Sequence, residues 1–195
     1  SVSTATSTKG VYVLGETASF DGSGNGKWNT GCFTGTRGLA GSYMLVEGLT
    51  QSDFSGSWTI EMWFRATSTG QTTTIFSMFG FLYLDFTIGF VSSIMNTNWN
   101  IKNNSGSVVS NDPTGLGSNG TWYHVGLSYS ASNQTYYRLF NGTATANSST
   151  LTIQSDNIAN YGFCLGARYN SSGSLQYPDF TNSASCQISD LRISK

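Results

Sequence analysis

Residues 58–66 of this chain read WTIEMWFRA, and this stretch decides the fold class. Its side chains alternate between two faces, with Trp58, Ile60, Met62 and Phe64 on one and the intervening residues on the other. A period of two residues belongs to a β-strand, whereas a helix repeats every 3.6 residues. Because each face carries a tryptophan, we predict a half-buried strand with aromatic packing on both sides.

The same alternation recurs in residues 121–129 (TWYHVGLSY). A strand predicted at 135–140 runs into Asn141-Gly142, a strong hairpin signal because both turn positions favour a positive φ. Other predicted strands are 11–14, 43–46, 73–79, 81–90, 94–101, 151–153, 162–167 and 188–193. About ten strands with regularly spaced turns and no helical pattern predict an all-β sandwich or barrel.

Composition narrows the class of protein. The 195 residues include 30 Ser, 24 Thr, 16 Asn and 23 Gly, whereas charged residues are only 10% and aromatic residues 14%. A net charge of −1 provides no basic surface for nucleic acid or anionic membrane, and no apolar run is long enough to insert into a bilayer. This composition is typical of an extracellular or virion-surface β protein. We expect residues 1–9 to be a flexible tail or linker and 10–195 to form one domain.

Three segments in order resemble a known family. They are residues 57–64 (SWTIEMWF), residues 121–127 (TWYHVGL) with the hairpin at 140–142, and residues 188–193 (ISDLRI). The trio is similar to the laminin G-like branch of the concanavalin A-like lectin/glucanase superfamily. The resemblance implies a two-sheet antiparallel jelly-roll sandwich that binds carbohydrate or protein on its concave face or rim loops.

The resemblance also suggests a role. Similar Ser/Thr/Asn-rich domains occur in tail and capsid-decoration proteins of phages. We therefore expect a non-catalytic virion-surface or extracellular module, present in many copies, whose partners are other surface proteins and cell-surface glycans, which it binds weakly. The alternatives are a secreted lectin-like adhesion domain and, third, a glycoside hydrolase or polysaccharide lyase. The opening residues 8–12 resemble the continuation expected after the closing strand, which suggests one module of a tandem array.

Catalytic residues are hard to assemble from this sequence. Glycosidases need two carboxylates that project into one groove, but Glu16, Glu47 and Glu61 are scattered. The single histidine, His124, could be a base or a metal ligand, but the matching histidine of the family is a packing residue. We therefore expect no enzymatic activity.

Sugar binding requires an exposed ring among amides or carboxylates, because the ring stacks on the pyranose and the polar groups orient its hydroxyls. Two segments offer this mixture. One contains a tryptophan between asparagines, and the other is a long polar segment before the closing strand. The candidate residues are Asn98, Trp99, Asn100, Tyr169, Asn170, Tyr177 and Asp179. The alternatives are a core position for the tryptophan and a plain surface loop for the second segment.

Cysteines and metals leave alternatives open. The resemblance implies a disulfide cysteine beside the closing strand, where Cys186 lies, with Cys164 as its partner and Cys32 left over. The alternative is three buried thiols in a virion assembled in a reducing cytoplasm. Calcium is common in this fold, but the seven aspartates are spread thinly and no ligand set is assigned.

The alternation and the resemblance together predict the core. The residues expected to be buried are Trp58, Met62, Phe64, Val125, Leu127 and Leu191.

Overall fold

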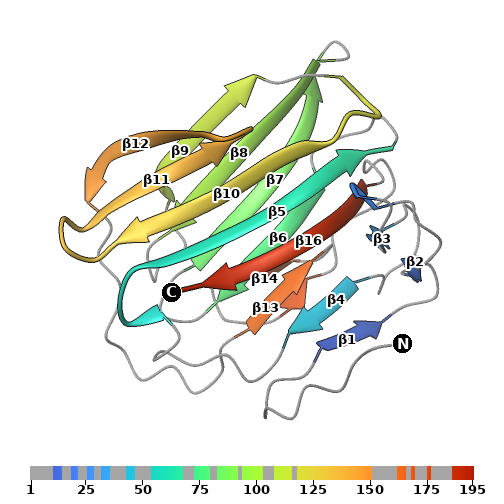
Figure 1. The fold of residues 1–195 in the computed structure, drawn as a ribbon, viewed down its shortest axis with the longest axis horizontal. Coiled ribbons are helices and arrows are strands. Elements are labelled where there is room, and N and C mark those ends of the chain that lie inside the picture. The colour runs from blue at the N-terminus through green and yellow to red at the C-terminus, as the bar shows by residue number, and fades with distance from the viewer. Residues whose placement is uncertain are drawn as a thin grey trace.

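Two β-sheets of seven strands each lie face to face, and a third sheet has two short strands (Figure 1). The computed structural model describes the backbone of residues 11–14, 19–21, 26–28, 32–35, 43–46, 54–67, 73–79, 83–91, 94–102, 108–115, 118–150, 162–165, 168–169, 175–176 and 186–195. It describes side chains over residues 26–28, 32, 54–67, 76–77, 118–146 and 187–195.

The sheet in front in Figure 1, called the front sheet, is built around the strand that decides the fold. In spatial order it contains β12 (Thr143–Thr150), β11 (Thr135–Phe140), β10 (Tyr123–Ser130), β5 (Trp58–Ala66), β16 (Cys186–Ser194), β3 (Cys32–Gly35) and β2 (Ser19–Asp21). The back sheet contains β1 (Val11–Leu14), β4 (Tyr43–Val46), β13 (Gly162–Leu165), β6 (Thr73–Phe79), β7 (Tyr83–Val91), β8 (Ile94–Lys102) and β9 (Val108–Gly115). The small sheet pairs β14 (Arg168–Tyr169) with β15 (Leu175–Gln176).

Every described strand pair is antiparallel, and no α-helix occurs among the described residues. Strand β5 lies in the middle of the front sheet, between β10 and β16, which are far from it in sequence. Non-local pairing of this kind joins the two ends of the chain into one sandwich. The predicted all-β, two-sheet antiparallel jelly-roll class is confirmed.

The core lies between the sheets. Side chains on the inner face of β5 and β10 are almost fully inaccessible to solvent, which confirms five of the six predicted core positions. These are Trp58, Met62, Phe64, Val125 and Leu127, each no more than 1% exposed. Rings pack edge-on and stacked within this layer, as Trp58 does with Phe54 and Tyr129.

The sixth core prediction is wrong, because Leu191 is half-buried. The pairing of β16 with β5 shifts between Ser189 and Arg192, so two residues of β16 stand opposite one residue of β5. Asp190 takes a φ of 53° at this bulge, and Ile188 on its N-terminal side is buried. Strict alternation placed Leu191 wrongly because the bulge adds a residue to the strand.

Five predicted strands have the observed bounds, namely β1, β4, β5, β6 and β11, and five others differ by one to two residues at one or both ends. The predicted strand 151–153 lies outside the described residues. Strands β2, β3, β9, β12, β14 and β15 were not predicted. Among them, β9 contains Pro113 and ends the back sheet, where a missing N–H is tolerated, and the small, polar β12 ends the front sheet.

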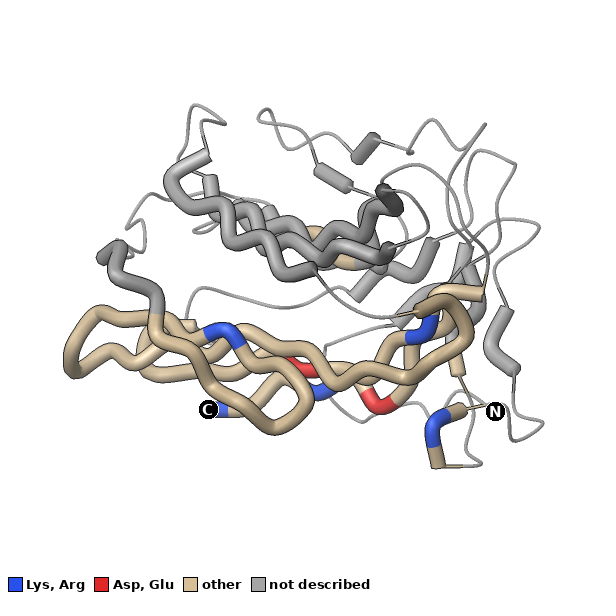
Figure 2. Tube along the Cα trace, turned by 90° about the horizontal axis from the view of Figure 1, so that it is seen from above, with Lys and Arg blue, Asp and Glu red and all other residues tan. Residues whose placement is uncertain are grey.

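The predicted tail at residues 1–9 lies outside the described residues. Within the described ranges, no helix is long and apolar enough to cross a membrane. Charged residues are sparse along the front sheet, and the two signs are interspersed (Figure 2).

Candidate functional site

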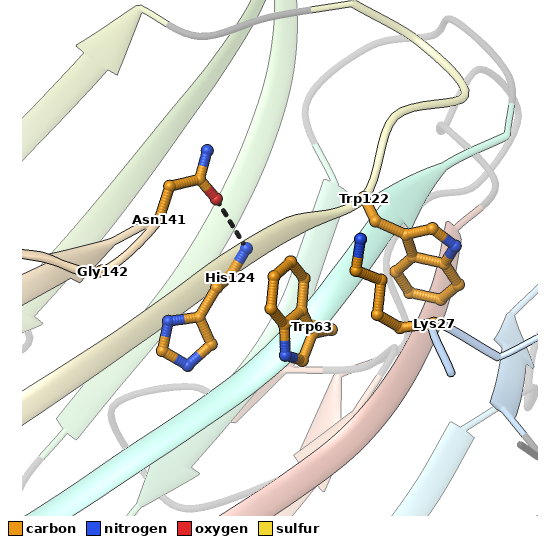
Figure 3. A pocket seen from close by; sticks show the side chains of 6 residues that line it. All are labelled: Lys27, Trp63, Trp122, His124, Asn141 and Gly142. Atoms are coloured by element: carbon orange, nitrogen blue, oxygen red, sulfur yellow. Dashed lines mark hydrogen bonds between the residues drawn. The ribbon is translucent and has the colours of Figure 1, made fainter. Parts of the chain in front are cut away.

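An open cavity of about 540 Å³ lies on the outer face of the front sheet, turned away from the back sheet (Figure 3). The residues that line it come from a short segment before β3, from β5, from the start of β10 and the residue that precedes it, and from the β11–β12 turn. They are Lys27, Trp63, Trp122, His124, Asn141 and Gly142. Strand alternation accounts for Trp63 and His124, because the neighbours of core residues on β5 and β10 must point outward.

Trp63 and His124 form the floor of this cavity. They stand directly opposite each other in the β5–β10 register, so their side chains leave the sheet on the same face. Their ring centroids are 5.3 Å apart at an interplanar angle of 46°. The register thus brings two rings from residues 61 positions apart in the sequence into contact, tilted relative to each other.

Lys27 and Trp28 enter the site from outside the sheet. The Lys27 backbone N–H donates to Ser189 Oγ at 3.4 Å, next to Trp63 in the β16–β5 register. The Nζ of Lys27 lies 4.6 Å from the centroid of the Trp63 ring and 5.3 Å from the centroid of the Trp28 ring. Trp28 packs edge-on against Trp63 with centroids 5.7 Å apart, and 60% of it remains exposed.

Glu61 holds the imidazole of His124 in position. Its Oε2 is 3.1 Å from His124 Nε2, and both side chains are partly exposed, at 27% and 20%. Glu61 and Trp63 are two positions apart on β5, and His124 stands opposite Trp63, so all three side chains lie on one face. The carboxylate is thus engaged by the ring beside it.

Trp122 forms the opposite wall and rests on a second cation. Arg65 Cζ lies 4.9 Å from the centroid of the Trp122 ring. The guanidinium donates from Nε to Gln187 Oε1 at 2.9 Å, and Nη2 donates to the same oxygen. Gln187 stands opposite Arg65 on β16, so the strand register fixes the guanidinium beneath the ring.

The β11–β12 turn closes the rim. Asn141 and Gly142 take φ values of 44° and 83°, which confirms the predicted hairpin. The Asn141 Oδ1 accepts from the His124 backbone N–H at 2.9 Å, and its own N–H donates to the His124 carbonyl oxygen at 2.9 Å. Asn141 therefore forms the turn, and its two hydrogen bonds hold the turn next to His124.

The cavity combines flat rings with polar groups that converge on one space. Indole faces offer dispersion contact to apolar C–H surfaces, while an amide, an imidazole and an ammonium offer hydrogen bonds and charge. Among the described residues, no group of three or more His, Cys, Asp or Glu is placed to hold a metal ion.

The sugar-binding residues predicted from sequence are not among the side chains that the structure describes. Asn98, Trp99 and Asn100 belong to β8 of the back sheet, and Tyr169 belongs to β14 of the small sheet, but their side chains are outside the described set. Asn170, Tyr177 and Asp179 lie outside the described residues altogether. They remain predictions.

The predicted disulfide also remains a prediction. Cys164 belongs to β13 in the back sheet and Cys186 to β16 in the front sheet, and neither side chain is described. Cys32, at the start of β3, is buried.

The sequence interpretation missed most of the residues that line the cavity. One signal was available for Trp63, Trp122 and His124: each occupies the opposite alternation phase to the core, and tryptophan is an unusual choice for a solvated face. No comparable signal pointed to Lys27 or Trp28, because their place depends on how a loop meets β16.

One family model, described as the concanavalin A-like lectin/glucanases superfamily, matches residues 38–194 of this chain. The match covers well over half of the sequence and includes all of the cavity except the Lys27 segment. Among curated proteins, none matches the chain.

Solved structures show a similar fold. The binding domain of botulinum neurotoxin serotype D has a TM-score of 0.65 at 10% identity, over 95% of this chain and 43% of that one. The binding domain of botulinum neurotoxin DC in complex with SialylT has a TM-score of 0.57 at 15% identity, over 95% and 42%. Alginate lyase A1-II′, of polysaccharide lyase family 7, has a TM-score of 0.51 at 14% identity, over 84% and 79%. The chain spans less than half the length of the neurotoxin binding domains, and identities this low show the fold alone.

Proposed function

This chain belongs to the concanavalin A-like lectin/glucanases superfamily, and we propose that it is a non-catalytic carbohydrate-binding module. The observation that carries the proposal is the cavity on the outer face of the front sheet, lined by Trp63 and Trp122 with polar groups between and beside them. Its volume of about 540 Å³ is within the range of small-ligand sites.

Tryptophans on this face need an explanation other than folding. The outer face of an antiparallel sheet is normally polar, since water contacts it. Here Trp63 and Trp122 are only half-buried and Trp28 is largely exposed, so they contribute little to the core between the sheets. Exposed apolar surface that gathers around polar groups is characteristic of a binding site.

The chemistry suits a pyranose ring. The C–H face of a sugar stacks on an indole, and its hydroxyls accept and donate hydrogen bonds at the rim. Asn141 and His124 place an amide and an imidazole there, and Lys27 adds an ammonium between the rings of Trp63 and Trp122 (Figure 3). Stacking would supply affinity, and the polar groups would supply orientation.

The similar structures support a binding module without deciding its ligand. Two of them are named binding domains, and one of these was solved in complex with SialylT. The fold therefore accommodates proteins that work by binding.

An enzyme is the second candidate, because the His124–Glu61 pair borders the cavity and an alginate lyase shares the fold. Hydrolysis of a glycosidic bond ordinarily needs two carboxylates across the bond. The described residues that line the cavity include no carboxylate, and Glu61 beside it is hydrogen-bonded to His124. These contacts favour binding over hydrolysis.

We further propose that the module acts on the surface of a virion or another extracellular assembly. A single open site of this kind binds with about millimolar to tens-of-micromolar affinity. Attachment at that affinity requires many linked copies, which a repeated surface component supplies. A secreted lectin-like adhesion domain is the alternative setting.

The test is a glycan array probed with multivalent wild-type protein and with Trp63→Ala. Removal of the indole should weaken binding at least about tenfold while thermal stability changes little. Tyr137→Ala is the matched control, because Tyr137, on β11, lies on the same outer face of the front sheet as Trp63 but outside the cavity.

Three results would count against the proposal: no glycan bound by the wild type, equal loss in Tyr137→Ala, or cleavage of a bound polysaccharide. Trp99→Ala and Tyr177→Ala belong in the same assay. If they abolish binding and Trp63→Ala does not, the site predicted from sequence is the correct one.

A further inference from the structure

We infer that the saccharide recognised by this site is acidic, and that the Lys27 ammonium binds its carboxylate. This inference rests on the proposed function and specifies its ligand class. It follows from the position of one cation and from the state of the charges around it.

The Lys27 ammonium is held at the cavity rather than extended into solvent. Its backbone is bonded to Ser189, and its side chain runs between the rings of Trp63 and Trp122 (Figure 3). The contact with Trp63, at 4.6 Å from the ring centroid, restrains the chain and keeps Nζ beside the space that a ligand would fill.

That ammonium lacks an anionic partner among the residues that the structure describes. The two ion pairs described there are His124 with Glu61 and Arg192 with Asp190. Asp190 accepts from Arg192 Nε at 3.0 Å and from Nη2 at 2.7 Å, so both of its oxygens are occupied. The carboxylates described on this face are thus already engaged.

A second cation lies beneath the cavity wall. Arg65 is bonded to the neutral amide of Gln187 and to the face of Trp122, neither of which carries a compensating negative charge. The described surroundings of the cavity therefore carry two positive charges, from Lys27 and Arg65, and one negative charge, from Glu61, that is paired with His124. An anionic ligand is favoured there over a cationic one.

A purely structural role for Lys27 does not account for the hydrogen-bond donors of its ammonium. Aromatic faces attract the cation, but an ammonium has three N–H donors that a ring cannot satisfy as oxygen does. A carboxylate would accept those donors in a charge-assisted hydrogen bond while the sugar ring stacks on an indole. A hexuronic acid carries both features in one residue.

The experiment uses an oligogalacturonide and its carboxyl-reduced form, in which each carboxylate has become a primary alcohol. A glucuronic-acid oligosaccharide and its reduced form provide a second pair. Binding of multivalent wild-type protein to each is compared with that of Lys27→Met, which keeps an aliphatic chain on Trp63, and Lys27→Arg, which keeps the charge.

We expect the wild type to prefer at least one acidic form about tenfold over its reduced form, in line with one charge-assisted hydrogen bond. Lys27→Met should lose the preference and Lys27→Arg should retain most of it. The preference of the wild type should also weaken as salt is raised, because screening acts on the charge and not on stacking.

Equal binding of the acidic and reduced forms, unaltered in Lys27→Met, would overturn the inference and leave the proposed carbohydrate binding intact. An acidic preference that survives in Lys27→Met would show that another residue binds the carboxylate, which also overturns the assignment. Absence of binding to every saccharide tested would instead contradict the proposed function itself.

Discussion

The two faces of strand β5 differ in solvent exposure and in the groups they contact, although their residues alternate within the same nine positions. On the inner face, Trp58, Met62 and Phe64 are each no more than 1% exposed, and they fill the core between the sheets. On the outer face, Trp63 and Glu61 are partly exposed and contact groups of different chemistry, an ammonium and an imidazole. The inner face thus fills the space between the sheets, whereas the outer face carries partly exposed rings and charges that contact one another.

Strand β10 shows the same division with one addition. Val125 and Leu127 point inward and are buried, while His124 points outward to the cavity. Between them Gly126 occupies an outward position where no side chain fits. On the outer face, close packing therefore requires a glycine at this position, where β10 lies between β5 and β11.

The largest effect should come from the inner face. Leu127→Ala removes a fully buried side chain and should lower the free energy of unfolding by about 2–5 kcal/mol through cavity formation. Leu139→Ala removes the same atoms from a half-buried position on the outer face of β11 and should cost about 1 kcal/mol. Urea unfolding of both variants provides the measurement. Equal losses of unfolding free energy in the two variants would contradict the proposed difference between the inner and outer faces.

A second, smaller effect should appear at Gly126. A Cβ there would lie 2.8 Å from the Ile60 carbonyl oxygen and 3.1 Å from Glu61 Cβ, and the backbone oxygen can yield only if the strand shifts. We expect Gly126→Ala to destabilise by about 1–3 kcal/mol, as overpacking does. Gly56→Ala is the matched control, since a Cβ at Gly56 meets nothing within 4 Å. A neutral Gly126→Ala would show that the outer face is loosely packed.

The inner face could be predicted from sequence because burial along a regular strand follows its alternation, which the family resemblance supported. A buried strand repeats every two residues, and that period placed five core residues correctly. It failed at Leu191, where a bulge changes the phase, and no residue type in ISDLRI announces a bulge. It also missed β9 and β12, since edge strands tolerate proline and small polar residues that a central strand excludes.

The candidate site could be predicted only in part, because it depends on register. Trp63 and His124 are both in strands that the sequence identified, yet their contact follows from the pairing of β5 with β10. Lys27 reaches the site through a hydrogen bond to Ser189, 162 positions away. Alternation says which residues share a face, but it does not say which of them meet.

The smallest effect should come from the far end of the same outer face. Thr59 and Ser128 stand opposite each other on β5 and β10, and Thr59 Oγ1 donates to Ser128 Oγ at 2.9 Å. The pair lies four residues from Trp63 along β5, or about 13 Å at roughly 3.3 Å per residue. A double-mutant cycle of Thr59→Ala and Ser128→Ala should give a coupling of about 0.5–1 kcal/mol, as expected for one partly exposed hydrogen bond. Glycan binding should be unchanged in both single variants, because neither side chain lines the cavity. Loss of binding in either variant would mean that the ligand extends along the whole strand pair, and the site would then be a groove rather than the single cavity between Lys27 and Asn141.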